Sequence, residues 1–180
     1  GSIKKSIRKI LVLGPELILG KIFDEVGFSK IPGSLFRHLV IARLVYPGSK
    51  LKTVQYLLQY KGIHTHEDRI YRYMDKFKLQ YEQAAINTVF GHTKKILNDK
   101  ITISFYDITT LYFEASEEDE LRKAGFSKDG KHQNPQILLA LLVAEHGYPL
   151  AYEVFEGSTY EGQTMIPVIQ SFKEKYKIST

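Results

Sequence analysis

The chain has 180 residues, of which 43% are hydrophobic and 25% are charged, a composition typical of a globular protein with a real core. It contains no cysteine, which excludes a disulfide scaffold and a thiolate metal site. No apolar stretch approaches the length that crosses a membrane, so the composition does not indicate a membrane-spanning protein.

The net charge of +5 is unevenly distributed along the chain. Residues 1–100 hold 18 basic and 8 acidic side chains, whereas residues 101–180 hold 7 basic and 12 acidic ones. A basic half followed by an acidic half is typical of a module that binds a polyanion, joined to a different kind of domain. Ordinary surface charge that happens to be uneven explains the same counts, and the composition leaves both interpretations open.

The first hundred residues predict five helices, near residues 15–25, 35–45, 50–60, 67–78 and 81–97. Pro15 suits a first helical turn, and Gly27 and Gly62 suit helix ends. Ser34, Ser49 and Thr65 are candidate N-caps. Apolar stripes on the first two helices are expected to face the core. They comprise Leu17, Ile18, Ile22 and Phe23 on the first helix and Phe36, Leu39, Val40 and Leu44 on the second.

The helix predicted near residues 67–78 is the best candidate for contact with nucleic acid. It carries Arg69, Arg72 and Lys76, interleaved with tyrosines. With the preceding short helix it is compatible with a helix-turn-helix, in which the second helix enters the DNA groove. Contact with the phosphate backbone in another geometry is the alternative interpretation.

The character of the sequence changes near residue 100. Residues 101–113 are apolar and β-branched and predict a strand. A second strand is expected at 136–144, a turn at His146-Gly147, a third strand at 148–155, and a helix that ends near Tyr176. The sequence therefore predicts an α+β protein, with a basic helical region at 1–100 and a second domain at 101–180.

Asp107 is the most unusual residue of the first predicted strand. Period-two alternation places it on the face that also carries Ile103, Phe105, Thr109 and Leu111. A charged carboxylate on an apolar face is costly unless a cation or hydrogen bonds compensate it, and phosphoryl-transfer enzymes hold metal ions in this way. The alternative is an ordinary Asp at a strand end, facing water or capping the following turn.

Several other polar residues have two possible interpretations. The glycine-containing segment 125–132 is basic and could approach a phosphate backbone, but a surface turn explains it equally well. It supplies Lys128 and Lys131 as candidate DNA contacts, with Arg122 just before it. His64 and His66 could bind a metal, although two histidines without a third ligand are more simply surface residues.

Several blocks of the sequence resemble the DDE-class transposases of bacterial insertion sequences, in the branch related to the insertion-sequence-4 group. The blocks are residues 42–44, 47–51, 71–75, 106–114, 121–132, 147–159 and 161–164. They cover nearly the whole chain, in the order and spacing of that branch. The resemblance implies a helical DNA-binding region followed by the first part of a ribonuclease H-like domain, with three antiparallel strands and a helix.

The resemblance also implies an active site of two Asp and one Glu that holds two Mg²⁺ or Mn²⁺ ions and cuts and joins DNA. Asp107 matches the first Asp, as catalytic residue and metal ligand. The other two carboxylates would lie beyond residue 180, so the chain is expected to be an internal fragment, inactive alone and without a bound ion. The implied partners are transposon-end and target DNA and further copies of the full protein in a homo-oligomer, with no membrane. The implied location is the bacterial cytoplasm, in association with the nucleoid.

Two alternatives to a transposase fragment remain open. The chain could be a non-catalytic DNA-binding remnant of a decayed element, in which Asp107 has no role. It could also belong to a ribonuclease H-fold nuclease that is not a transposase, although the blocks at 125–132 and 147–159 argue against this.

Overall fold

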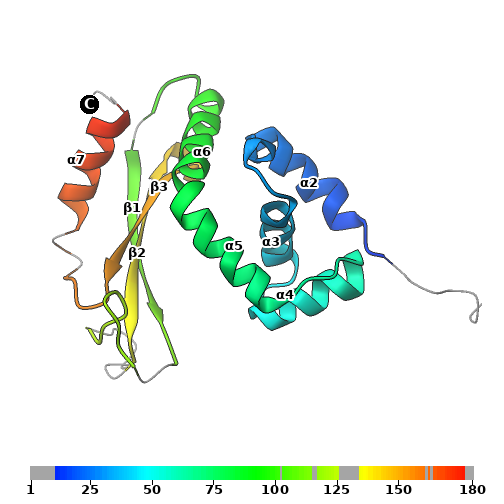
Figure 1. Cartoon of the computed structure of the whole chain (residues 1–180). Helices are drawn as coiled ribbons and strands as arrows, with labels where there is room; N and C mark the ends of the chain where they lie inside the picture. Colours follow the sequence, from blue (N-terminus) through cyan, green and yellow to red (C-terminus); the bar gives the residue numbers. More distant parts are fainter. Residues whose placement is uncertain are drawn as a thin grey trace, which may run out of the picture. The chain divides into compact units, whose positions relative to one another are not determined.

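The computed structural model describes residues 11–101, 103–114, 117–125, 134–160, 162 and 164–176. Within them the chain is an α+β protein with six α-helices and a three-stranded antiparallel sheet (Figure 1). It divides into two units, Gly1–Thr88 and Val89–Thr180, here called the helical unit and the sheet unit. The division falls inside helix α6, ahead of the boundary expected at residue 100, because Phe90 of α6 and Leu97 just after this helix pack into the core of the sheet unit.

The helical unit follows the order of helices that the sequence predicts. Its elements are α2 (Gly14–Val26), η1 (Phe28–Lys30), α3 (Ser34–Val45), α4 (Lys50–Tyr56), the π-helical turn η2 (Leu57–Lys61), α5 (Glu67–Gln80) and the start of α6 (Glu82–Ile96). Pro15 lies in the first turn of α2, and Gly27 ends that helix in the left-handed conformation, at φ 98°. The Ser49 hydroxyl accepts a hydrogen bond from the Lys52 amide at 3.2 Å, which confirms it as the N-cap of α4.

Two of the expected N-caps are wrong. Helix α3 begins at Ser34 itself, after Gly33, and no side chain caps it. Helix α5 begins after His66, and the Thr65 hydroxyl is buried without a hydrogen-bond partner among the described residues. In both places the N-cap is the neighbouring residue, because the backbone enters the helix one residue away from the position that the hydroxyl needs.

The core of the helical unit is largely aromatic. Phe36 stacks on Phe77 with ring centroids 4.7 Å apart and contacts Phe23 at 5.4 Å, so α2, α3 and α5 meet at these rings. The expectation that the apolar stripe of α2 faces the core is wrong for most of its members. Only Phe23 is buried, whereas Leu17, Ile18 and Ile22 are 72%, 66% and 50% exposed.

Ile70 anchors α5, because its side chain is completely buried in the helical unit. Replacing Ile70 by Ala removes buried methyl groups and leaves a cavity, so we expect a loss of about 2–5 kcal/mol of unfolding free energy. Urea unfolding followed by circular dichroism measures it. Leu79→Ala is the matched control, since Leu79 lies on the same helix, is 84% exposed, and should change stability by less than about 0.5 kcal/mol. Equal effects of the two substitutions would contradict the packing of α5.

The sheet unit contains the three strands in the order β1-β2-β3, as predicted. They are β1 (Ile103–Tyr112), β2 (Gln136–Ala144) and β3 (Pro149–Glu156), with η3 (Glu145–Gly147) as the predicted turn and α7 (Met165–Tyr176) after the sheet. Both strand pairs are antiparallel. The turn is tight because His146 and Gly147 both adopt positive φ, at 61° and 82°.

The two faces of this sheet differ in burial. One face carries Leu138, Ala140 and Leu142, which are at most 2% exposed, and Leu142 packs with Phe172 of α7. The opposite face carries Leu141 and Tyr152, each 39% exposed.

In the part of the chain that the structure describes, every helix is too short or too polar to cross a lipid bilayer.

Candidate functional site

Asp107 lies in the middle of β1, so the alternative interpretation is wrong about a strand end, but it is confirmed in that the side chain faces water. Its backbone pairs with Leu141 of β2, and Leu141 in turn pairs with Tyr152 of β3. Residues that pair directly across antiparallel strands point to the same face of the sheet. Asp107, Leu141 and Tyr152 therefore form one row across the open face, and all three side chains are exposed.

The exposure of Asp107 changes the energetic argument that the sequence suggested. The face is apolar, as expected, but nothing in the described residues covers Asp107, and its carboxylate stays in contact with water. An exposed carboxylate does not need a cation to compensate for lost hydration. Burial therefore does not force a metal ion onto Asp107, and any role in metal binding rests on the position of the side chain.

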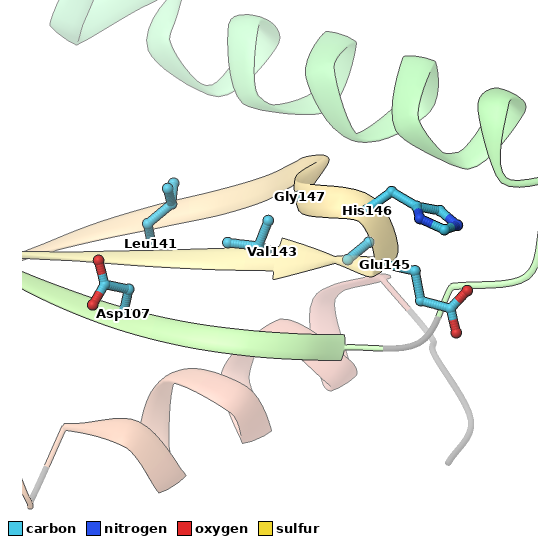
Figure 2. Close-up of a pocket in the computed structure, with 7 residues that line it drawn as sticks. Asp107, Leu141, Val143, Glu145, His146 and Gly147 are labelled. Carbon is cyan, nitrogen blue, oxygen red and sulfur yellow. The ribbon is translucent and has the colours of Figure 1, made fainter.

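A hollow of about 700 Å³ lies next to Asp107 on this face. Its floor is apolar and is formed by Leu141, Val143 and Ala144, and the η3 turn closes its far end with Glu145, His146 and Gly147. Figure 2 shows the Asp107 carboxylate on the same side of the sheet as the Leu141 and Val143 side chains. The sequence predicts His146 only as part of a turn, and no sequence pattern singles out Glu145. The pairing of β1 with β2, which brings the turn and Asp107 into one hollow, was the missing information.

The described residues do not complete a metal centre. No group of three or more His, Asp or Glu side chains within them is arranged to hold a metal ion. This includes His64 and His66, so the described structure brings no third ligand to them. At the hollow, Asp107 supplies one carboxylate, whereas Mg²⁺ needs several oxygen ligands in near-octahedral geometry. The residues present therefore do not by themselves fit the two-ion site that the resemblance implies.

The candidate DNA contacts on α5 form a second surface, within the helical unit. Arg69, Arg72 and Lys76 are all exposed, and their spacing places them along one side of the helix. The buried side of α5 is a different one and carries Ile70. No salt bridge involves these three side chains among the described residues, although the Lys76 ammonium lies 5.7 Å from the centre of the Tyr81 ring. The three residues are called the α5 basic stripe.

Helix α4 contacts α5, as the first helix of a helix-turn-helix contacts the second. The segment between the two helices departs from that motif. Helix α4 continues directly into η2, so the helical run extends to Lys61 before the turn. Residues 62–66 then lead into α5.

Arg122 is a further candidate DNA contact, and its side chain already binds Asp119. Its guanidinium donates to the Asp119 carboxylate at 2.6 Å and lies 5.4 Å from the centre of the Phe113 ring. Hydrogen bonds from the Arg122 and Leu121 amides and from the Arg122 side chain lower the pKa of Asp119 to about 2. A phosphate would have to compete with Asp119 for this guanidinium. Lys128 and Lys131 lie outside the described residues.

In comparisons with known proteins, no protein-family model, no curated protein and no solved structure matches the chain. The membership of the transposase class therefore stays a prediction from the sequence blocks. The α+β architecture and the antiparallel strand order stand on the structure itself.

Proposed function

We propose that the chain is part of a DDE-class DNA transposase, in which the helical unit binds DNA and the sheet unit begins a ribonuclease H-like catalytic domain. The observation that carries the proposal is Asp107. It is an exposed carboxylate at the centre of the first strand of a β1-β2-β3 antiparallel sheet, at the position that matches the first catalytic Asp in the sequence blocks.

The topology supports this assignment. Because β1 and β3 are both antiparallel to β2, they run parallel to each other. Helix α7 follows β3, and a strand after a crossover helix normally returns parallel to the strand before it. The outer edge of β1 has no partner strand among the described residues. A further strand on that edge would run about 4.8 Å from β1, close enough to place a second carboxylate beside Asp107.

The site would act on DNA phosphates through carboxylate-bound divalent ions. Two such ions activate the attacking oxygen and stabilise the leaving oxygen of a displacement at phosphorus. Asp107 would be one ligand, and the remaining carboxylates would come from parts of the protein outside this chain. Asp107 is exposed beside an open hollow, so its carboxylate is accessible to both an ion and a bulky DNA strand.

The α5 basic stripe would hold the DNA backbone. Each phosphate that a basic side chain neutralises contributes about 0.9 to the slope of log affinity against log salt concentration. Replacing Arg69, Arg72 and Lys76 together by Ala should therefore lower that slope by up to about 3 for a short DNA duplex. Fluorescence anisotropy between 50 and 200 mM salt measures this change.

A second triple variant controls for the loss of charge. Lys21, Lys30 and Lys78 are exposed residues of the same unit that are not part of the stripe, and they lie on α2, on η1 and on another side of α5. Their replacement by Ala removes the same total charge and should leave most of the slope intact. If the two triple variants lower the slope equally, the stripe is not a DNA-binding site and only net charge attracts DNA.

A second candidate function is DNA binding without catalysis. It is favoured by the α5 basic stripe, and by the finding that the described residues hold no group of three or more His, Asp or Glu side chains arranged to bind a metal ion. The two candidates share the DNA-binding result above and differ in cleavage. Cleavage of transposon-end DNA that depends on Asp107 supports the transposase and excludes this alternative.

A further inference from the structure

An ion-pair network joins three helical elements inside the helical unit. The Glu16 carboxylate of α2 accepts hydrogen bonds from Arg37 Nε of α3 at 2.5 Å and from Lys61 Nζ of η2 at 3.2 Å. Arg37 also donates to the Asp24 carboxylate at 2.7 Å. The Lys61 side chain is only 9% exposed, so its charge depends on Glu16 for compensation.

The sequence provides the room that this network needs. A Cβ atom on Gly20 would lie 2.3 Å from Arg37 Nη2 and 2.9 Å from Glu16 Oε1, so a larger residue there would require the ends of these two side chains to shift. The π-helical turn η2 brings Lys61 to the same place. The Arg37 guanidinium also lies 5.3 Å from the centre of the Phe23 ring, which ties the network to the aromatic core.

This network explains the unusual distribution of side chains on α2. The helix turns Glu16, Gly20 and Phe23 toward the unit and leaves Leu17 and Ile18 exposed. Charge pairing by Glu16 and the buried Phe23 ring therefore both contribute to the attachment of α2. An attachment of this kind responds to changes in protonation.

His38, the neighbour of Arg37 on α3, is the group that can change the charge of the network. Its Nδ1 atom is buried and has no hydrogen-bond partner among the described residues. Burial lowers the pKa of His38 below its usual 6.5, Lys61 and Arg37 lower it further, and Glu16 opposes them. From α4 the network meets Tyr56, whose buried hydroxyl has its pKa raised by burial and by Glu16 and stays neutral.

We propose that His38 and the Glu16–Arg37–Lys61 network form a pH-sensitive latch that holds α2 on the helical unit. At neutral pH His38 is uncharged and the two cations are balanced by Glu16 and Asp24. Protonation adds a third positive charge in a half-buried place and releases α2 from α3 and η2. Helix α5 stays in place, because the side chain of Ile70 on this helix is completely buried in the unit.

The direction of the pH effect follows from the lowered pKa of His38. A histidine whose pKa is lower when α2 is attached binds protons more readily when α2 is released, so falling pH favours release. The effect begins near pH 6.5. Arg37 and Lys61 outweigh the effect of burial and hold the pKa of Glu16 below its usual 4.5, so Glu16 remains charged until lower pH. The window for His38 alone is therefore between about pH 6.5 and 4.5.

Amide hydrogen exchange of the 180-residue chain tests the latch, after correction for the intrinsic exchange rate at each pH. Between pH 7.5 and pH 5.0 we expect the protection of α2 amides, such as that of Phe23, to fall by up to about 30-fold. Protection of α5 amides should not change. In His38→Gln the α2 amides should show no fall. In His66→Gln, which alters an exposed histidine of the same unit, the fall should persist.

Three results would overturn the latch: constant α2 protection in the unsubstituted chain, a fall that persists in His38→Gln, or an equal fall in α5. A measurement on the unsubstituted chain covers the case in which His38→Gln does not fold. In the unsubstituted chain, titration of the His38 imidazole by nuclear magnetic resonance should give a pKa below 6.5. A value at or above 6.5 contradicts the proposal. Glu16→Gln should lower α2 protection already at pH 7.5, whereas Glu25→Gln, on the exposed side of α2, should not.

Discussion

Replacing Asp107 by Asn is expected to abolish DNA cleavage by the complete protein while leaving the fold of the sheet unit unchanged. Asn keeps the size of the side chain but removes the charge that would hold a divalent ion. Such an ion contributes several kcal/mol to stabilising the transition state, and each 1.4 kcal/mol is a factor of about ten, so we expect a loss on the order of 10³-fold or more. Because Asp107 is exposed, stability should change by less than about 0.5 kcal/mol.

Glu153→Gln is the matched control for this substitution. Glu153 is also an exposed carboxylate on a strand, but it pairs with Ala140 and so lies on the opposite face of the sheet. Its replacement should leave cleavage within about twofold of the original rate. Full cleavage by the Asp107→Asn protein, or equal loss in both variants, would show that Asp107 has no catalytic role.

Gly157→Ala is expected to destabilise the sheet unit by about 3 kcal/mol. A Cβ atom on Gly157 would lie 2.1 Å from the Gln136 carbonyl oxygen and 2.5 Å from the Lys123 carbonyl oxygen. Both oxygens belong to the backbone of a bridge in which the amides of Lys123 and Gln136 each donate to the other residue's carbonyl. Neither of the two segments can move aside without breaking these hydrogen bonds.

The closeness at Gly157 involves one further glycine and one buried side chain. A Cβ atom on Gly125 would lie 2.1 Å from the Gly157 carbonyl oxygen, and the Gln136 side-chain amide donates to that oxygen at 2.8 Å. The close packing of Gly125, Gln136 and Gly157 is here called the clamp. It fixes the chain just before the basic segment 126–133, which lies outside the described residues. The interpretation of Gly125 as part of a surface turn is therefore incomplete, because Gly125 packs closely against the Gly157 backbone.

Urea unfolding monitored by circular dichroism measures the effect at Gly157. Gly91→Ala is the matched control in the same unit, because a Cβ atom on Gly91 meets nothing within 4 Å. Gly91 lies inside α6, where Ala is the better helix former, so this substitution should be neutral or stabilise by about 1 kcal/mol. Equal stability of the two variants would mean that the clamp is looser than described.

Local signals in the sequence predicted the elements well. Ser49, Gly27 and Gly62 act through their own backbone geometry, and so they mark the helix boundaries without knowledge of the rest of the fold. The strands around Asp107 were predicted for a similar reason, since a run of apolar and β-branched side chains favours extended backbone wherever it occurs.

Two features of the structure that the sequence did not predict depend on tertiary contacts. The apolar stripe of α2 was expected in the core, but Glu16 meets Arg37 and Lys61, which lie 21 and 45 residues away in sequence. Periodicity cannot anticipate such a pairing. In the same way, the position of Glu145 and His146 at the hollow beside Asp107 follows from the register of β1 against β2, which no local pattern determines.

Reading the source gene beyond the codon for Thr180 tests the central claim most directly, namely that Asp107 is the first carboxylate of a transposase metal site. We predict that the reading frame continues into an apolar strand ending in Asp, with a Glu on a later helix. Those carboxylates would complete the site that Asp107 begins on the open face of the sheet. A stop codon or a scrambled frame at that point would contradict the claim and leave DNA binding by the α5 basic stripe as the function to test.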